Sequence, residues 1–423
     1  GKAADVLPGL ETMSKREKLP IFYFDKYGNP TEKPEVKKPN IEIKDQKKRE
    51  LFESVKVGDE LIIANMTYQK ISDDAFIRSD DEPLLSGTIH NQITSRNDLA
   101  QLIDLYWVPL GDLKVVKYSG DKELPKVVED PDLVRQMKKD FALIQNELYP
   151  KPWMSRLSGR DIINGIQRSD INQGGFGDCY LLAAINSVKK THPELYLQTL
   201  MRTIHKGKEP GQWEVSFTGV TAGEGSADQP IIVNQENLDA WHRGAKADLA
   251  DIILERAYAS LKSRQMHGQM GMTNNVDAMG RRAFEGGLGH RALDDILGGE
   301  IAKKIAIGDY ARDGWGTMSE NGLAEKARQF LINEYAKRPD QYIVTANTPH
   351  QKNGQALNDT RYEMFGLMRV HYKHAFSVTG VVNGNVLLEN PHNTSLKHSM
   401  PLDSFVNYFS QLSYVKIRAE YQE

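Results

Sequence analysis

The sequence predicts an α+β protein in which a small β-rich module precedes a larger region with a helical half and a strand-rich half. Three observations support this prediction. Short β segments separated by polar turns occupy much of residues 51–128. Apolar residues then recur at helical spacing over several stretches. From about residue 300, one more helix precedes several strands. We therefore expect a cleft between a helical half and a strand-rich half.

Composition narrows the possible functions. The 423 residues are enough for two or three domains, and 39% hydrophobic and 26% charged content is ordinary for a soluble protein. The net charge of −3 gives no global electrostatic reason to expect nucleic-acid binding, and no apolar run predicts a membrane span. A single cysteine excludes an intrachain disulfide framework and zinc sites built from several thiolates. We expect no cofactor and no bound metal.

The first 50 residues are predicted to be a charged, proline-containing arm or linker. From Lys26 onward they mix prolines and charges, including the cluster Lys47-Lys48-Arg49, with few apolar positions. A segment of this composition buries little apolar surface. We therefore expect it to be a solvated connection rather than part of a core.

Residues 51–128 are predicted to form a small β-rich accessory domain, either a barrel or a sandwich. Candidate strands are Val55–Ala64, Leu105–Val108 and Leu113–Tyr118. Such a module is expected to be a targeting or regulatory element with possible accessory binding, or simply to pack on the rest of the protein.

A connecting helix is predicted over residues 129–150, because Asp130-Pro131-Asp132 is a typical helix start and apolar residues follow at helical spacing. The helical half, residues 151–300, contains predicted helices at Cys179–Lys190 and Asp248–Ser263. The strand-rich half, residues 301–423, has the following predicted elements: a helix at Leu323–Tyr335, a strand at Tyr342–Ala346, and one strand each at His374 and Asn390.

The only cysteine, Cys179, follows a glycine-rich segment and precedes a run of helix-forming apolar residues. Gly177-Asp178 can turn the chain and cap a helix, which places Cys179 in the first helical turn. The unpaired N–H groups and the positive end of the helix dipole there favour a thiolate. A thiolate is the working form of a cysteine nucleophile. A small buried apolar cysteine is the alternative.

Five segments in order resemble the calpain family of cysteine proteases, which have the papain fold. The first surrounds the cysteine and two of the others contain a histidine and an asparagine. The segments are Gln173-Gly174 with Gly177-Asp178-Cys179 and Leu181-Leu182-Ala183-Ala184; Glu255-Arg256-Ala257-Tyr258-Ala259-Ser260-Leu261; Ala292-Leu293-Asp294-Asp295-Ile296-Leu297-Gly298-Gly299; His374-Ala375-Phe376-Ser377-Val378-Thr379-Gly380; and Leu387-Leu388-Glu389-Asn390-Pro391.

The resemblance implies a papain-like two-lobed core, with the cysteine helix in the helical lobe and the histidine and asparagine in the β lobe. It implies that Cys179 is the nucleophile, His374 the base and Asn390 its orienting group. Gln173 and the Cys179 backbone N–H would donate to the oxyanion. A loop-bracing hydrogen bond is the alternative role for Gln173.

Three positions depart from the family pattern. Tyr180 replaces the usual tryptophan, His392 stands where a tryptophan normally shields the histidine–asparagine pair, and Lys373 replaces a glycine before the histidine. We expect Lys373 and His392, together with Gly298 and Gly299, to lie on the substrate-binding side of the cleft.

The hairpin between the two strands offers a geometric check. A regular two-residue loop at Asn383-Gly384 would place position 374 opposite position 393. The Asn390 side chain would then face away from His374, because side chains alternate along a strand. A working pair therefore requires an odd-length loop or a β-bulge, and we predict such an irregularity.

The expected activity is calcium-independent limited proteolysis of a protein substrate. Calcium requires six to eight oxygen ligands, but residues 391–401 contain no acidic side chain and residues 269–291 contain only Asp277 and Glu285. Two alternatives remain: a thiol-dependent glutamine deamidase or transglutaminase, and a catalytically inactive binding scaffold with this fold. We expect a cytoplasmic enzyme or an effector or toxin delivered into a target cell.

Overall fold

A computed structural model describes most of the chain. The described residues are 22–24, 30–32, 40–63, 66–78, 93–105, 108–120, 131–144, 154, 157–267, 284–298, 302–306, 323–352, 355–357, 360–366 and 368–417. Within these ranges, no helix is both long enough and apolar enough to cross a bilayer.

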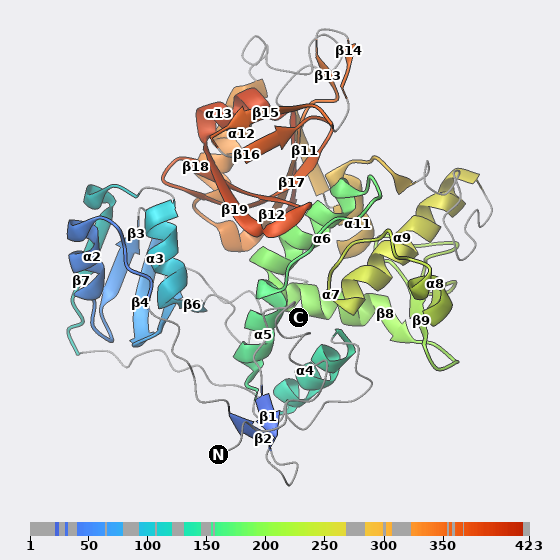
Figure 1. The fold of residues 1–423 in the computed structure, drawn as a ribbon, viewed down its shortest axis with the longest axis horizontal. Helices are drawn as coiled ribbons and strands as arrows, with labels where there is room; N and C mark the ends of the chain where they lie inside the picture. The colour runs from blue at the N-terminus through green and yellow to red at the C-terminus, as the bar shows by residue number, and fades with distance from the viewer. Residues whose placement is uncertain are drawn as a thin grey trace.

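The N-terminal part contains one five-stranded antiparallel sheet, ordered β6-β5-β4-β3-β7, with two helices packed on it (Figure 1). Since β6 and β7 are its edges, the described strands do not close into the predicted barrel, and helices rather than a second sheet cover the core. The elements are α2 Gln46–Glu53, β3 Glu60–Ile63, β4 Met66–Ser72, β5 Ala75–Arg78, β6 Ile93–Ser95, α3 Arg96–Leu105, η1 Leu110–Asp112 and β7 Leu113–Val116.

Two predictions for this part are wrong. The charged arm was expected to extend to residue 50, but Ile43 is buried and helix α2 begins at Gln46. Its single buried residue, Phe52, lies at the end of a run of charged residues, so composition alone did not reveal the helix. The predicted strand at Leu105–Val108 is also wrong where it is described, because Leu105 is the last residue of helix α3.

Upstream of this sheet, β1 pairs with β2 in a short antiparallel ribbon within the predicted arm. Downstream, a helix is present where the sequence predicted one to start, at Asp130-Pro131-Asp132. The bounds are β1 Phe22–Phe24, β2 Pro30–Glu32 and α4 Pro131–Ile144.

The next part is mainly helical, and its core is continuous around helix α6. It also contains a three-stranded antiparallel sheet, ordered β10-β9-β8. The two predicted helices in this part are present, as α6 and α9. The elements are α5 Gly159–Arg168, α6 Cys179–Thr191, α7 Pro193–Thr203, β8 Ile204–Lys206, β9 Gln212–Val215, β10 Ile231–Asn234, α8 Gln235–Asp239, α9 Leu249–His267 and α11 Gly289–Leu297.

The C-terminal part is built on a six-stranded antiparallel sheet, ordered β11-β20-β12-β17-β18-β19. The predicted helix before it continues as one turn of π-helix, η3. The elements are β11 Ala302–Ala306, α12 Leu323–Gln329, η3 Phe330–Tyr335, η4 Pro339–Gln341, β12 Tyr342–Asn347, β13 Gln351–Lys352, β14 Gln355–Ala356, β15 Tyr362–Phe365, β16 Met368–His371, β17 Ala375–Val382, β18 Asn385–Asn390, β19 Asn393–Pro401, α13 Leu402–Tyr408 and β20 Gln411–Lys416.

Helix α6 lies against one face of this sheet, while α12, η3 and α13 share a core with the other face (Figure 1). Along β17, Ala375 belongs to the core around α6, whereas Phe376 and Val378 belong to the opposite core. Two hydroxyl groups connect the helix to the sheet: Ser187 donates to the Val344 carbonyl and Ser377 donates to the Ala183 carbonyl. The helix that carries Cys179 is thus fixed directly to the strand that follows His374. Helical and antiparallel parts of this kind make an α+β fold.

Candidate active site

Cys179 is the first residue of helix α6, as predicted, and its side chain is partly buried. The Asp178 carbonyl accepts the N–H groups of Leu181 and Leu182, which closes the first turn. The expected side-chain cap is absent, because the Asp178 side chain makes no capping hydrogen bond and is fully buried instead. The first-turn N–H groups of α6 are therefore not occupied by this carboxyl group.

The glycine-rich segment before Cys179 is tightly packed. A Cβ atom on Gly174 would lie 2.2 Å from the carbonyl oxygens of Arg243 and Gly244, so only glycine fits. The Gly175 N–H donates to the Arg243 carbonyl over 2.8 Å. The glycines thus let the loop before Cys179 lie directly on the 241–246 segment.

Gln173 is anchored through both its backbone and its side chain. Its backbone N–H donates to the Pro391 carbonyl (2.8 Å), and its Nε2 donates to the Phe176 carbonyl (2.7 Å). The side-chain bond matches the loop-bracing role considered from the sequence. An amide nitrogen carries two hydrogens, so this bond leaves one for another acceptor.

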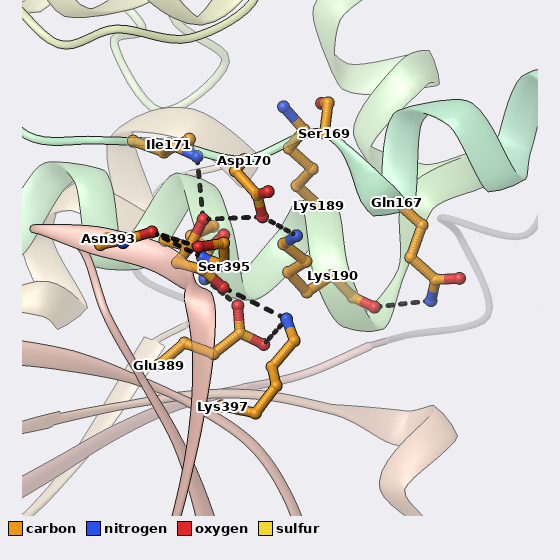
Figure 2. A network of polar contacts seen from close by, with 12 residues as sticks. Gln167, Ser169, Asp170, Ile171, Lys189, Lys190, Glu389, Asn393, Ser395 and Lys397 are labelled. Carbon is orange, nitrogen blue, oxygen red and sulfur yellow. Dashed lines mark hydrogen bonds and ion pairs between the residues drawn. The ribbon is translucent and has the colours of Figure 1, made fainter. Parts of the chain in front are cut away.

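Residues 170–173 are also connected to the turn that follows Asn390. Ile171 donates its N–H to Thr394 Oγ1 and accepts the Thr394 N–H, and Thr394 Oγ1 donates to Asp170 (Figure 2). Lys190 of helix α6 pairs with Asp170 over 3.0 Å. The Gln173 and Asn390 segments, far apart in sequence, are therefore held side by side.

His374 precedes strand β17 and is 3% exposed. Thr348 holds its backbone: the His374 N–H donates to Thr348 Oγ1, and the Thr348 N–H donates to the His374 carbonyl. Lys373 has φ +48°, in the left-handed region. This conformation is easy for glycine and costs other residues roughly 1–2 kcal/mol. The left-handed backbone at this position is therefore one reason why a glycine would be favoured there.

His374 and Asn390 are in direct contact, with 2.7 Å between His374 Nε2 and Asn390 Oδ1. The same oxygen accepts the backbone N–H of His392 over 3.0 Å, which fixes the orientation of the amide. Because Asn390 Oδ1 can only accept, Nε2 must carry the hydrogen. In neutral His374 this leaves Nδ1 with a lone pair that can take a proton.

The predicted irregularity in the hairpin is confirmed. The loop is the two-residue Asn383-Gly384 turn, with both residues at positive φ, but the β17–β18 register shifts between Val378 and Gly380. Beyond this bulge Ser377 pairs with Glu389, so Asn390 is on the face occupied by Phe376 and His374. One extra residue in β17 thus brings the histidine and asparagine side chains together.

Three histidine rings cluster here. The His374 centroid lies 4.4 Å from that of His392 and 5.9 Å from that of His371. Burial lowers the pKa of His374 to about 3, and the positive charges that His392 and His371 can carry add to this effect. Both effects favour the neutral form of His374.

The predicted substrate-binding residues fall into two groups. Lys373 and His392 flank His374 and Asn390, and His392 is exposed although its ring covers that of His374. Gly298 ends helix α11 at φ +134° and donates its N–H to the Asp294 carbonyl. Gly299 lies outside the described residues.

Sequence reasoning missed Thr348, Asp170 and Thr394, which position the site residues but lie far from most of them in the sequence. No motif indicates them, because their roles depend on contacts across the fold. Among described residues, no three histidine, cysteine or acidic side chains are grouped as metal ligands. Most of the 269–291 segment considered for calcium lies outside the described residues.

Comparisons with known proteins agree with the segments identified above. The model of the calpain family of cysteine proteases matches residues 150–397, which is more than half of the chain. A comparison with curated proteins found no match. The matched region contains the cysteine helix, the β17–β18 hairpin and the segments that connect them. The chain therefore belongs to the calpain family of cysteine proteases.

Proposed function

We propose that the protein is a cysteine endopeptidase that performs limited proteolysis through Cys179, His374 and Asn390. The observation that supports this most directly is the 2.7 Å contact between His374 Nε2 and Asn390 Oδ1, together with a cysteine at the start of helix α6. The core is then a papain-like pair of lobes, with the substrate cleft where the start of α6 meets the His374 end of the sheet. Its helical lobe spans residues 151–300 and its β lobe residues 301–423.

The chemistry follows from the proton positions. Neutral His374 holds a hydrogen on Nε2 and takes the Cys179 thiol proton on Nδ1 as the sulfur attacks the substrate carbonyl. Because burial lowers the pKa of His374, the resulting imidazolium is a strong acid and readily protonates the departing amine. Water then attacks the acyl-enzyme while His374 Nδ1 takes its proton; the C–S bond breaks, the acid product leaves, and His374 returns the proton to the Cys179 sulfur.

The developing oxyanion needs donors already in place. We assign these to the Cys179 backbone N–H at the start of α6 and to the second hydrogen of Gln173 Nε2. The bond from Gln173 to the Phe176 carbonyl orients the amide, and the bond to Pro391 connects it to the Asn390 turn. Bracing and donation are therefore compatible roles for this side chain.

The other parts of the proposal concern regulation and accessory contacts. We propose that activity does not require calcium, because the acidic side chains of residues 269–291 and 391–401 number only two. We also propose that the residues before Ile43 form a connecting arm, that an accessory domain extends from there to residue 128, and that residues 129–150 form a connecting helix. Within the accessory region, the folded part begins earlier than residue 51, since Ile43 and α2 belong to its core.

The test compares the native chain with Cys179→Ala on a denatured protein substrate, using mass spectrometry with and without calcium. We expect cleavage by the native chain alone, at equal rates in calcium and in chelator. Cysteine-dependent deamidation or cross-link mass shifts without cleavage would instead show a glutamine deamidase or transglutaminase. No reaction in either chain, with a slowly alkylated Cys179, would show an inactive scaffold. Activity lost in chelator and restored by calcium would refute calcium independence.

A further inference from the structure

Directly before the nucleophile, the Asp178 carboxyl group is completely buried, with 0% exposure. No N–H or O–H group of another described residue donates to either of its oxygens. An ionised carboxylate left in this position would be very costly, because it would lose hydration without gaining hydrogen bonds. The sequence predicted that Asp178 would cap helix α6, but its side chain is buried away from the first-turn N–H groups.

The group that faces Asp178 is a second carboxyl, that of Glu255 on helix α9, which acts on Asp178 through both its charge and a side-chain contact. Glu255 is also fully buried. Its Oε1 accepts the Trp241 indole N–H over 2.6 Å and the Ala245 N–H over 2.9 Å, while Oε2 receives no N–H. Two buried carboxyl groups in contact require a shared proton, because like charges at this distance disfavour double ionisation.

The donors decide which group holds the proton. Two N–H groups stabilise the ionised form of Glu255, and Asp178 receives none from another residue, so the proton belongs on Asp178. The charged groups around the pair do not move the proton from Asp178 to Glu255. Arg256 lies over the Trp241 ring and Arg243 over the Phe176 ring, while the Glu285 carboxylate is close to Gly177 and adds negative charge.

We propose that Asp178 is a neutral carboxylic acid that donates its proton to Glu255 Oε2, and that this keeps the negative charge away from the adjacent Cys179 sulfur. Asp178 is then a positioning residue that sets thiol ionisation through charge placement. Burial, with the adjacent Glu255 charge, raises the pKa of Asp178 well above its usual range, and a charge on Cys179 acts in the same direction. By reciprocity, a charge on Asp178 would oppose thiolate formation.

The inference concerns the cysteine assigned as nucleophile under the proposed function, but its test does not depend on proteolysis. The measured quantity is the rate of Cys179 alkylation by iodoacetamide as a function of pH. The midpoint of this curve reports how readily the thiol loses its proton, whether or not a substrate is ever cleaved. A protein that fails to cleave substrate can therefore still confirm or refute the charge arrangement.

Asp178→Asn is the decisive variant, because asparagine has the shape of the protonated acid and its amide can donate to Glu255. We expect an unchanged midpoint, since no charge is removed. If Asp178 were ionised in the native chain, this change would remove a charge next to the sulfur. The midpoint would then move to lower pH, and the proposal would be overturned.

Glu255→Gln is the matched opposite variant. Glutamine keeps the Oε1 acceptor for Trp241 and Ala245, but its amide would donate to Asp178 and favour ionisation there. We expect the midpoint to move to higher pH, with alkylation roughly tenfold slower at a fixed pH below the midpoint. The double variant Asp178→Asn/Glu255→Gln contains neither charge and should move the midpoint to lower pH. An unchanged midpoint in Glu255→Gln would overturn the proposal.

A measurement on the native chain covers the case in which a variant does not fold. Infrared spectroscopy at pH 8 should detect the carbonyl stretch of a protonated carboxyl group, shielded from solvent exchange by burial. Where Asp178→Asn folds, that band should be missing from its spectrum. A native spectrum without such a band would show that the pair holds no proton and would overturn the proposal.

Discussion

Two adjacent lysines of helix α6 lie on different sides of the helix and have different charged neighbours. On the helical side, Lys189 is fully buried between Asp248 and Asp251, at 3.2 and 2.8 Å. On the side of the sheet, Lys190 pairs only with Asp170 and is close to a second lysine, Lys397 (Figure 2). Two adjacent residues of one type thus occur in opposite electrostatic settings.

The pKa values follow these settings. Burial alone lowers the pKa of Lys189, but the two carboxylates outweigh it and raise the pKa above its ordinary value. Burial also lowers the pKa of Lys190, Lys397 lowers it further, and Asp170 and Glu389 compensate only in part, so that it falls to about 8. His374, on the sheet, also has a lowered pKa. The helical side therefore holds fixed charges, while the side of the sheet holds groups that titrate within an accessible pH range.

The largest expected effect comes from removing the fixed cation. Lys189→Met leaves two buried carboxylates without their partner and should lower the free energy of unfolding by about 3–5 kcal/mol. The matched control, Lys190→Met, should cost less, because it removes the partner of one carboxylate, Asp170, rather than of two. Urea unfolding at pH 7 measures both. Equal losses would contradict the contrast between the two sides.

Acid should destabilise the protein through His374. Its pKa is about 3 when folded and about 6.5 when unfolded, so the unfolded chain binds more protons between these values. The stability that neutral His374 contributes is present above about pH 6.5 and is lost as pH falls towards 3. The slope contributed is up to about 1.4 kcal/mol per pH unit. Urea unfolding from pH 7 to 4 should show a smaller slope for His374→Gln; the same slope would refute the assignment.

The dependence of stability on pH above pH 8 should reflect the lowered pKa of Lys190. Its pKa is about 8 when folded and 10.5 in the reference state, so the unfolded chain again binds more protons between them. The free energy of unfolding should therefore gain a positive slope from pH 8 to 10.5, which Lys190→Met removes. Lys189 stays charged in the folded protein, and in the unfolded chain it begins to lose its proton only near pH 10.5, so it adds little slope at the lower pH values. Denaturant titrations at about pH 7.5, 8.5 and 9.5 measure the free energy of unfolding of the native chain and of Lys190→Met, and only the native chain should show the rise.

The smallest effect sharpens the comparison. Lys397 pairs with Glu389 over 2.9 Å and lowers the pKa of Lys190. Lys397→Gln removes that repulsion, so the alkaline rise in stability should begin at a higher pH while the unfolding midpoint at pH 7 changes little. A rise that begins at the same pH as in the native chain would show that Lys397 does not act on Lys190.

Much of the candidate site could be predicted from local sequence. The start of α6 at Cys179 follows from glycines before a helix-forming run, and the strands on either side of Asn383-Gly384 follow from apolar runs around a turn. Because side chains alternate between the two faces of a strand, a contact between His374 and Asn390 then required an irregularity in the hairpin. The bulge between Val378 and Gly380 satisfies this requirement.

Other features could not be predicted because they depend on partners distant in sequence. Asp178 looks like a helix cap until Glu255 and the burial of both carboxyl groups are known. Lys189 and Lys190 look alike beside the C-terminus of a helix, where either would favour the dipole. Likewise, charged residues surround Phe52 in the sequence, so the sequence did not indicate that helix α2 covers the N-terminal sheet.

The sequence by itself determined the start of the cysteine helix, the family and the need for a bulge, because these depend on residue type and on spacing along the chain. Only the tertiary structure decided where protons and charges reside, from the amide of Asn390 to the two lysines of α6. The physical reason is that desolvation and Coulomb interactions depend on which groups meet inside the fold, and local sequence does not specify those neighbours.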